Sequence, residues 1–246
     1  MVFKSKSDLK SYLKENCVFI NFGSRGSAYF DKKLKIVIKV FDMALSENDY
    51  RYFEYKDLDF LRFSNALNST YLFPYENVIL DGRVIGYLSH VGKGKSLYKL
   101  DPLIVNLDSI KSAYSKALID LKIISKKGIL TDDLPYNTLF SIEMGKFYVV
   151  DTDDYHLVDS DEKSTYDDNV SQLSYTVKTF LVDGYFDDFI KSDKELSELY
   201  QSGDLLSFLK AYRKKLSEKV GKSIITLSEA SEIQDEEHWR EYMRVL

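Results

Sequence analysis

Apolar and polar residues follow each other along the first ninety positions in short runs that are typical of β-strands. A Gly/Ser turn and then Asp31-Lys32-Lys33 separate the first three runs, and the Asp81-Gly82 pair separates the last two, as in a hairpin. We therefore expect an antiparallel sheet of five strands. The strand candidates are Cys17–Phe22, Ala28–Phe30, Leu34–Phe41, Asn77–Leu80 and Val84–Ser89.

One helix is expected between the third and the fourth of these strands. Ser46 is a suitable N-cap, and acidic residues follow it in the first turn. Apolar residues then recur at helical spacing from Tyr50 to about Leu67. The first part of the chain thus has the predicted order β-β-β-α-β-β.

The second part of the chain has mostly helical periodicity. Apolar residues from Ile110 to Ile124 mark one clean helical face that ends near Gly128. Two short strands follow, hinged at Met144-Gly145, and later helical patterns cover 170–182, 205–216 and 233–245. The fold class expected is α+β with two lobes, a β-rich one over residues 1–91 and an α-rich one over 92–246, and a site between them.

Composition narrows the possible functions. The formal net charge is −5 and the pI is about 5.4, so no general attraction to nucleic acid or to anionic membranes is expected. No segment approaches the ~18 apolar residues of a membrane span, and the Lys- and Ser-rich start, with no apolar stretch behind it, is unlike a signal peptide. The single cysteine, Cys17, excludes an intramolecular disulfide. We expect a cytoplasmic protein, with secretion that needs no cleavable signal left open.

Zinc chemistry and a Ser/His triad are not indicated, because the three histidines lie far apart with no second ligand at metal spacing. Paired charges are more informative. Lys39 interrupts an otherwise apolar strand, and Glu54 lies in the middle of the apolar face of the expected helix. A buried carboxylate needs a cationic partner, and Lys39 is the nearest candidate along the chain.

Three further segments carry polar residues at turns or strand ends. Gly23-Ser24-Arg25-Gly26 could bring backbone amides close to phosphate oxygens, although Gly/Ser turns are also common in ordinary hairpins. Asn137 and Asp151 flank the two short strands of the second half, the first before them and the second after them. An amide and a carboxylate from adjacent hairpin strands could converge on Mg²⁺, which takes few protein oxygens and completes its shell with phosphate and water.

The order of these segments resembles that of protein kinases from about Asn21 to Leu181. The glycine loop of the family is similar to Asn21–Tyr29, with Asn21 in place of the first glycine, and its strand lysine motif resembles Ile36-Val37-Ile38-Lys39. The catalytic-loop pattern of Asp, two residues, Pro, one residue and Asn fits Asp132, Pro135 and Asn137.

The resemblance implies roles for individual residues. Lys39 would hold the α- and β-phosphates of ATP and pair with Glu54, and Asp132 would orient the acceptor hydroxyl. Asn137 and Asp151 would bind Mg²⁺ or Mn²⁺, and Asp168 would brace the catalytic loop from the central helix. The ATP-binding residues implied are Gly23, Ser24, Gly26, Ala28, Val37, Lys39, the hinge residues Leu88, Ser89, His90 and Val91, and Leu139.

Departures from the family pattern leave alternatives open. Leu130 and Thr131 stand where kinases have His and Arg, Asp153 replaces the glycine of the metal-binding motif, and little room remains for an activation segment. The function expected is ATP-dependent phosphoryl transfer to a hydroxyl of an unidentified protein or small molecule. A pseudokinase that binds nucleotide or protein is the main alternative, and nucleotidyl transfer on the same fold is a minor one. The sequence does not indicate the oligomeric state.

Overall fold

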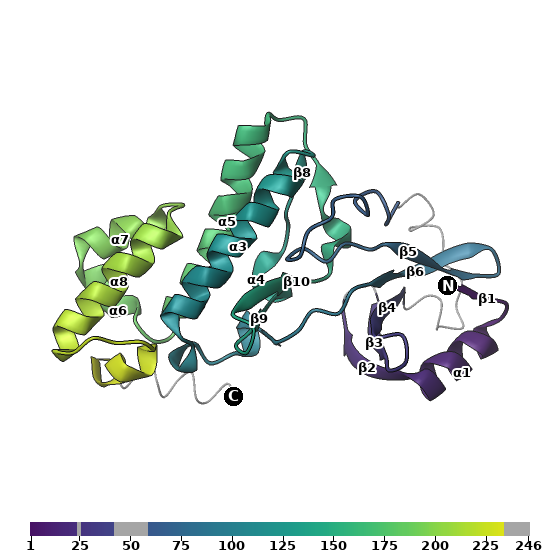
Figure 1. The fold of residues 1–246 in the computed structure, drawn as a ribbon, viewed down its shortest axis with the longest axis horizontal. Coiled ribbons are helices and arrows are strands. Elements are labelled where there is room, and N and C mark those ends of the chain that lie inside the picture. The colour runs from purple at the N-terminus through teal and green to yellow at the C-terminus, as the bar shows by residue number, and fades with distance from the viewer. Residues whose placement is uncertain (24–25, 42–58, 234–246) are drawn as a thin grey trace. The chain divides into compact units, whose positions relative to one another are not determined.

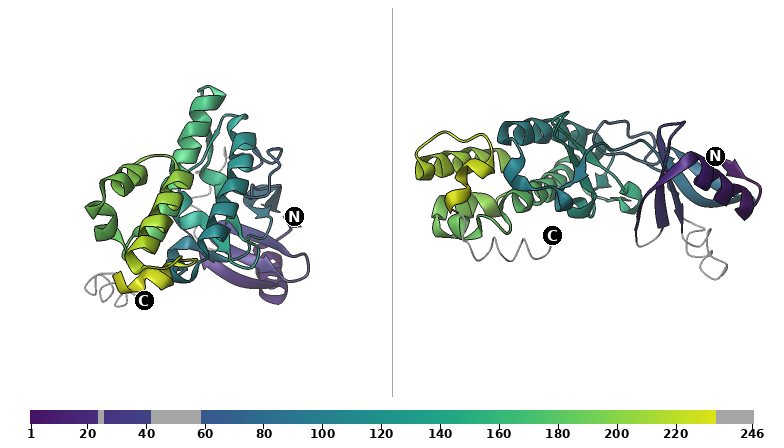
Figure 2. Two further views of the ribbon diagram at one scale, coloured as in Figure 1. Left: turned by 60° about the vertical axis from the view of Figure 1, so that its left-hand side comes forward. Right: turned by 90° about the horizontal axis from the view of Figure 1, so that it is seen from below.

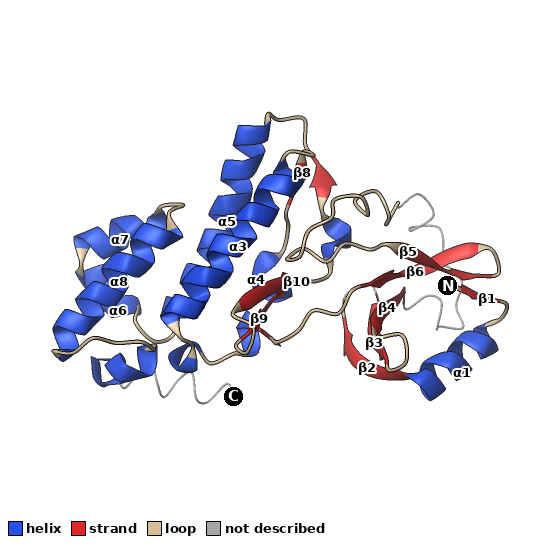
Figure 3. Cartoon of the chain, in the orientation of Figure 1, coloured by secondary structure: helices blue, strands red, loops and turns tan. Residues whose placement is uncertain are grey.

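The computed structural model describes residues 1–23, 26–41 and 59–233 (Figure 1). The chain forms two compact units, Met1–Gly92 with Val150–Asp153, and Lys93–Val149 with Asp154–Leu246. Strands predominate in the first and helices in the second, as the colouring of Figure 3 shows. The expected α+β class is confirmed.

The first unit is built on one sheet of six strands in the order β1-β5-β6-β4-β3-β2. The five predicted strands are present and antiparallel to their neighbours. The prediction of an all-antiparallel sheet is wrong, because β1 pairs in parallel with β5 and adds a sixth strand at that edge. The strands are β1 Val2–Phe3, β2 Cys17–Phe22, β3 Gly26–Asp31, β4 Ile36–Phe41, β5 Glu76–Leu80 and β6 Arg83–Ser89.

Helix α1, Lys6–Asn16, precedes the meander and was not predicted. Its only fully buried side chains are Leu9 and Leu13, one turn apart, and the other positions are mostly Lys, Ser and acidic residues. Two apolar residues are too few for a clear periodic signal. The Ser5 hydroxyl nevertheless caps the helix by accepting the Asp8 N–H at 3.1 Å.

The two faces of the sheet have different environments. Ile38 and Val40 of β4 are fully buried in a core that includes Leu9 and Leu13 of α1. Because side chains alternate along a strand, Lys39 lies on the opposite face. Figure 2 shows α1 alongside the strands of this sheet. The packing of α1 therefore sets which face of the sheet is left for polar residues.

The hairpin turns follow their sequence signals. Asp81 and Gly82 both have positive φ, 48° and 74°, as a tight two-residue turn between β5 and β6 requires.

The helix expected over 46–67 falls mostly on 42–58, outside the described residues. Its predicted last part, from 59 to 67, is not helical: Ser64 and Ala66 donate to carbonyls three residues back, as in consecutive turns.

The second unit is largely helical, and α3 and α5 run side by side in it (Figures 1 and 2). Helix α3 matches the predicted apolar face, and α5 and α8 contain the predicted helical segments. The pattern at 233–245 lies almost wholly outside the described residues. The helices are α3 Leu107–Ser125, α4 Leu134–Asn137, α5 Glu162–Val182, α6 Asp187–Ser192, α7 Lys194–Gln201 and α8 Leu205–Val220.

Short strands complete this unit. β9 and β10 form the expected hairpin, with Gly145 at φ 51° in its turn, and β7 pairs with β9. The strands are β7 Lys95–Ser96, β8 Ile129–Leu130, β9 Thr138–Ser141, β10 Lys146–Val149 and β11 His156–Leu157. Single 3-10 turns occupy 97–99, 102–104 and 152–154, and a longer 3-10 segment covers 227–233. No helix in the described ranges combines the length and the apolar character that crossing a bilayer requires.

Candidate functional site

Lys39 lies on the face of the first unit's sheet that is opposite the core formed with helix α1. Strand pairing sets Ala28 of β3 on one side of it and Tyr87 of β6 on the other. Val37, two residues earlier on β4, shares the same face and is half-buried. The sheet thus presents Ala28, Val37, Lys39 and Tyr87 together, and its pairing register accounts for their proximity.

The Lys39 ammonium contacts two carboxylates that follow strand β10. It forms an ion pair with Oδ1 of Asp151, which is 112 residues away in sequence, and lies 3.1 Å from Oδ1 of Asp153. The Tyr87 hydroxyl donates to the same two atoms, at 3.1 Å for Asp151 and 2.8 Å for Asp153. Lys39, Tyr87, Asp151 and Asp153 form a compact group, which we call the lysine–carboxylate cluster.

The two carboxylates of the cluster differ in exposure. The side chain of Asp153 is 1% exposed and that of Asp151 is 38% exposed, whereas the Lys39 side chain is 9% exposed. Asp151 is thus the acid of the cluster that a dissolved ligand can reach. Lys39 and Tyr87 both contact its Oδ1, and Oδ2 lies near Gly23.

Burial and charge act in opposite directions on these groups. Burial lowers the pKa of Lys39, but the charges of Asp153 and Asp151 outweigh it and leave that pKa above its usual value. Burial raises the pKa of Asp151, and the nearby Asp153 charge adds to this against the effect of Lys39. For Asp153, burial is outweighed by Lys39 and by hydrogen bonds, so its pKa is lowered. With both acids ionised, the cluster carries an excess of negative charge that favours a further cation.

Hydrogen bonds from side chains to backbone carbonyls connect the 150–153 segment to the rest of the first unit. Asp151 has φ 56°, a left-handed conformation that Asp tolerates better than most residues. The Thr152 hydroxyl donates to the Leu72 carbonyl at 3.3 Å, and the Arg62 guanidinium donates to the Asp153 carbonyl at 3.1 Å. These contacts fix where the two carboxylates point.

Close packing against β4 explains one glycine of the expected phosphate loop, Gly26, but not the other, Gly23. A Cβ on Gly26 would lie 2.4 Å from the Val40 carbonyl oxygen, so close pairing of β3 with β4 explains this glycine without any ligand. A Cβ on Gly23 would meet only ordinary contacts, one of them at 3.9 Å from Oδ2 of Asp151. The start of the turn therefore lies beside the exposed acid. Ser24 is outside the described residues.

The predicted hinge residues fall at the end of β6. Leu88 is buried in the core, and its carbonyl accepts the Tyr75 N–H at 3.0 Å, while Ser89 pairs with Val37. His90 follows the strand, and its ring stacks on Tyr75 with centroids 4.9 Å apart. The Leu88 carbonyl is thus already used by the protein, and His90 and Val91 are the predicted hinge residues that lie beyond the strand.

The predicted catalytic-loop residues lie in the second unit. Asp132 is exposed and accepts the Asp133 N–H at 2.8 Å, and Asp133 itself is left-handed with φ 50°. Asn137 ends the short helix α4, and Leu139 follows on β9, half-buried. The expected loop is thus one helical turn, which Pro135 favours near its start.

The residue of α5 that supports this loop is Asn169, one position after the predicted Asp168. Asp168 is exposed, whereas its neighbour Asn169 is fully buried. The Asn169 side-chain oxygen accepts both the N–H and the hydroxyl of Thr131, at 2.8 and 2.9 Å. Its amide group donates to Ser125 and to the Ile129 carbonyl. The prediction for Asp168 is wrong, because the inward face of α5 carries the amide and not the acid.

Sequence reasoning missed Tyr87 and Asp153 as members of the cluster, together with the supporting Arg62. In the sequence, Asp153 stood out only because it replaces the glycine of the kinase metal-binding motif. No pattern around Tyr87 in the sequence indicates that this residue lies beside Lys39 in the sheet. Glu54, the expected partner of Lys39, lies outside the described residues. Among the residues that the structure describes, the carboxylates paired with Lys39 are those of Asp151 and Asp153.

The donor set at the cluster suits Mg²⁺ or Mn²⁺. The exposed carboxylate of Asp151 can supply one of the few protein oxygens that Mg²⁺ takes when phosphates and water supply the rest. Within the described ranges, no group of three or more His, Cys, Asp or Glu side chains is arranged to hold a metal by itself. A metal bound through Asp151 would therefore depend on further oxygens, from phosphate and water.

No model of a protein family matches the chain, and no curated protein shows significant sequence similarity to it. The lysine–carboxylate cluster is consequently the feature of this protein that bears most directly on function.

Proposed function

We propose that this protein is an ATP-dependent phosphotransferase of the protein-kinase-like superfamily. It would transfer the γ-phosphoryl group, assisted by Mg²⁺, to a hydroxyl of an unidentified protein or small-molecule acceptor. The observation that carries the proposal is the contact of Lys39 with Asp151. Lys39 lies on a strand, and Asp151 follows a hairpin strand far away in sequence. Protein kinases use such a lysine for the triphosphate and such a carboxylate for its metal.

The first unit would supply the phosphate-binding groups. Lys39 would exchange part of its contact with the carboxylates for phosphate oxygens, and Asp151 would use its exposed carboxylate for the metal. Bound Mg²⁺ would neutralise and orient the phosphates. Asp153 and Tyr87 would keep the ammonium and the metal-binding carboxylate in position. Ala28 and Val37, on the same sheet face as Lys39, would contact the adenine ring.

Asp132 and Asn137 of the second unit keep the roles that the kinase resemblance implies. Asp132 would orient the acceptor hydroxyl, and its exposed carboxylate is suited to that task. Asn137 would be the second metal ligand. Each role is a prediction of the resemblance, and each can be tested by substitution.

Nucleotide binding is the first test. We expect saturating ATP with Mg²⁺ or Mn²⁺ to raise the melting temperature by about 5 °C or more, because a ligand that binds only the folded state stabilises it by mass action. Asp151→Asn removes the metal-binding charge and keeps a residue that tolerates positive φ. It should abolish the metal-dependent part of the shift. Asp159→Asn, at another exposed acid, is the matched control.

The absence of any shift with ATP and either metal would refute the proposal, as would an equal shift in wild type, Asp151→Asn and Lys39→Met. Turnover is measured next, from radioactive γ-phosphate released or bound to protein. Binding without phosphate transfer would identify a pseudokinase. Mass spectrometry would detect an added AMP group if the protein transfers nucleotide.

A further inference from the structure

Strand β2 is the last strand of its sheet and is unusually apolar. It pairs with β3 on one side, and on the other side no described strand is its neighbour. Edge strands are normally protected by charged residues, proline or a covering element, but Cys17–Phe22 contains neither charge nor proline. The exposed fractions of its apolar side chains are 50% for Val18, 52% for Phe19, 52% for Ile20 and 72% for Phe22.

The backbone of β2 offers hydrogen-bonding groups at this open side. The Lys32 N–H donates to the Asn16 carbonyl at 3.1 Å, so these residues form a hydrogen-bonded pair just before the strand. Bonded and non-bonded pairs alternate between antiparallel strands. Phe19 opposite Tyr29 is therefore a non-bonded pair, and the N–H and C=O of Phe19 point to the open side.

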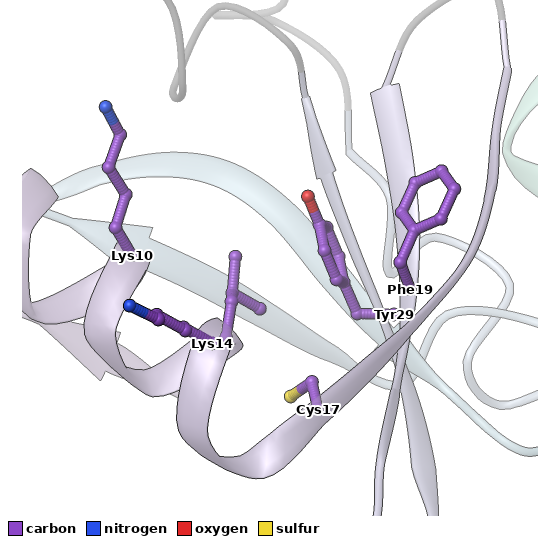
Figure 4. A pocket seen from close by; sticks show the side chains of 6 residues that line it. Lys10, Lys14, Cys17, Phe19 and Tyr29 are labelled. Carbon is purple, nitrogen blue, oxygen red and sulfur yellow. The ribbon is translucent and has the colours of Figure 1, made fainter.

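A hollow of about 430 Å³ lies beside the first half of this strand (Figure 4). The rings of Phe19 and Tyr29 form one wall in an edge-to-face contact, with centroids 5.7 Å apart. Lys10 and Lys14 of α1 line the hollow from another side. The hollow thus combines an apolar wall, an open strand edge and two ammonium groups.

The cysteine and the acid beside this hollow are both buried. Burial raises the pKa of the Cys17 thiol to about 11, so the thiol stays protonated and unreactive near neutral pH. The neighbouring Asp31 is fully buried and accepts hydrogen bonds from the Tyr12 hydroxyl and from two backbone N–H groups. Accessible charge at the hollow is therefore positive and suited to binding an anionic partner.

We propose that β2 and this hollow form a docking site for an extended, acidic segment of a partner protein, which adds to the sheet as a seventh strand. Its backbone would pair with the open side of β2 at Phe19, and alternate apolar side chains would enter the hollow. Its carboxylates would meet Lys10 and Lys14. A second copy of this chain fits less well, because its own β2 carries no carboxylate to meet Lys10 and Lys14. This site is independent of the proposed phosphotransferase activity.

The test uses a fluorescent ten-residue peptide that alternates glutamate with valine or phenylalanine, added to the full chain. We expect saturable binding, at least tenfold weaker for Lys10→Glu combined with Lys14→Glu, and slower hydrogen exchange over residues 17–22 on binding. Phe19→Pro removes an outward N–H and an apolar wall residue, and should also weaken binding at least tenfold. Lys111→Glu combined with Lys116→Glu, at exposed positions of α3, is the charge-matched control.

Binding that is equal in wild type and in the Lys10/Lys14 variant would overturn the proposal, as would no binding at millimolar peptide. A peptide with lysine in place of glutamate should bind at least tenfold more weakly, and equal binding would contradict the acidic specificity. If the free protein dimerises and Phe19→Pro abolishes the dimer, the surface belongs to a second copy instead. Because Phe19→Pro could disturb folding, the Lys10/Lys14 variant decides the outcome.

Discussion

Asn169 accepts hydrogen bonds from both the backbone N–H and the hydroxyl of Thr131, the residue directly before Asp132. Its own amide donates to the Ser125 hydroxyl and the Ile129 carbonyl, at 2.8 and 2.9 Å. One buried side chain thus links α5 to the end of α3 and to strand β8. The conformation of the segment that leads to Asp132 depends on it.

We expect Asn169→Leu to destabilise the protein by roughly 3 kcal/mol, because buried donors and acceptors lose their partners. Asn169→Asp should also destabilise the protein, because its buried carboxylate still accepts from Thr131 but has no proton to donate to the Ile129 carbonyl that it faces. Asp168→Asn, one residue earlier and exposed, should change stability by less than about 0.5 kcal/mol. Urea unfolding followed by circular dichroism measures all three. Equal effects at 168 and 169 would contradict the assignment of Asn169 as the brace.

Lys39 compensates two neighbouring carboxylates, so its removal should be costly even without nucleotide. We expect Lys39→Met to lower the free energy of unfolding by roughly 2 to 4 kcal/mol at pH 7.5, since it leaves like charges close together with Asp153 buried. Lys32→Met, at an exposed position, is the control. Urea titrations give both values.

The free energy of unfolding that Lys39→Met loses should depend on pH in a definite direction. Without the ammonium, the pKa values of Asp151 and Asp153 in the folded protein should rise above those of the unfolded chain. Stability of the variant then falls as pH rises through the acidic range. The difference between wild type and Lys39→Met should therefore narrow at pH 4.5. A difference that stays constant between pH 4.5 and 7.5 would mean that the carboxylates are not coupled to Lys39.

Tyr12 and Asp31 connect the unpredicted helix α1 to the sheet. The Tyr12 hydroxyl donates to Oδ2 of Asp31, and Oδ1 accepts two backbone N–H groups at 2.8 Å. Burial alone would raise the pKa of Asp31, but hydrogen bonds, first from the Leu34 N–H and then from Tyr12, bring it below its usual value. Asp31 thus contributes stability above pH ~4 that is lost as pH falls through its lowered pKa.

We expect Tyr12→Phe to cost about 2 kcal/mol at pH 7 and to move acid unfolding to higher pH, because the pKa of Asp31 rises when this donor is lost. Tyr98→Phe, at an exposed ring, should leave the acid midpoint unchanged. Far-UV circular dichroism between pH 2 and 6 measures the midpoints. Coincident curves for wild type and Tyr12→Phe would show that the hydroxyl does not stabilise the Asp31 carboxylate.

Periodic apolar patterns predicted those elements that bury one continuous face. Helix α3 was predicted because its apolar residues repeat with period 3.6, and strand β4 because it is a short run of apolar, mostly β-branched residues interrupted only by Lys39. Helix α1 was missed because Leu9 and Leu13 alone mark its buried side. Strand β1 has two residues, and its pairing with β5 depends on contacts nearly eighty positions along the chain.

The candidate site was predictable only in part, because some of its contacts join segments that are far apart in the sequence. Lys39 and Asp151 could be singled out because each is a charge next to an apolar strand. That Asp153 and Tyr87 complete the cluster depends on the register of β4 with β6 and on the left-handed turn at Asp151, which local patterns do not encode. The choice of Asn169 over Asp168 is a rotation of about 100° on one helix, which a family pattern at loose spacing does not resolve.

Lys178 provides a last test, in the second unit. This residue of α5 is 1% exposed, and its ammonium donates to the Ser202 carbonyl and, at 3.3 Å, to that of Leu199, at the end of α7. Burial lowers its pKa to about 8 from an ordinary value of 10.5, against the opposing charge of Asp204. Between these two values the unfolded chain binds more protons than the folded protein. Stability contributed by this residue therefore rises with pH from about 8 to 10.5.

We expect the free energy of unfolding of wild type, relative to Lys178→Met, to increase by roughly 2 to 3 kcal/mol between pH 7.5 and 10. Comparison with the variant removes the contribution of the other groups that titrate in this range. Lys210→Met, exposed on α8, should follow wild type at every pH. Guanidinium unfolding at intervals of half a pH unit gives the two curves. Parallel curves for wild type and Lys178→Met would mean that Lys178 keeps its ordinary pKa, and that the carbonyls of Leu199 and Ser202 offset its burial.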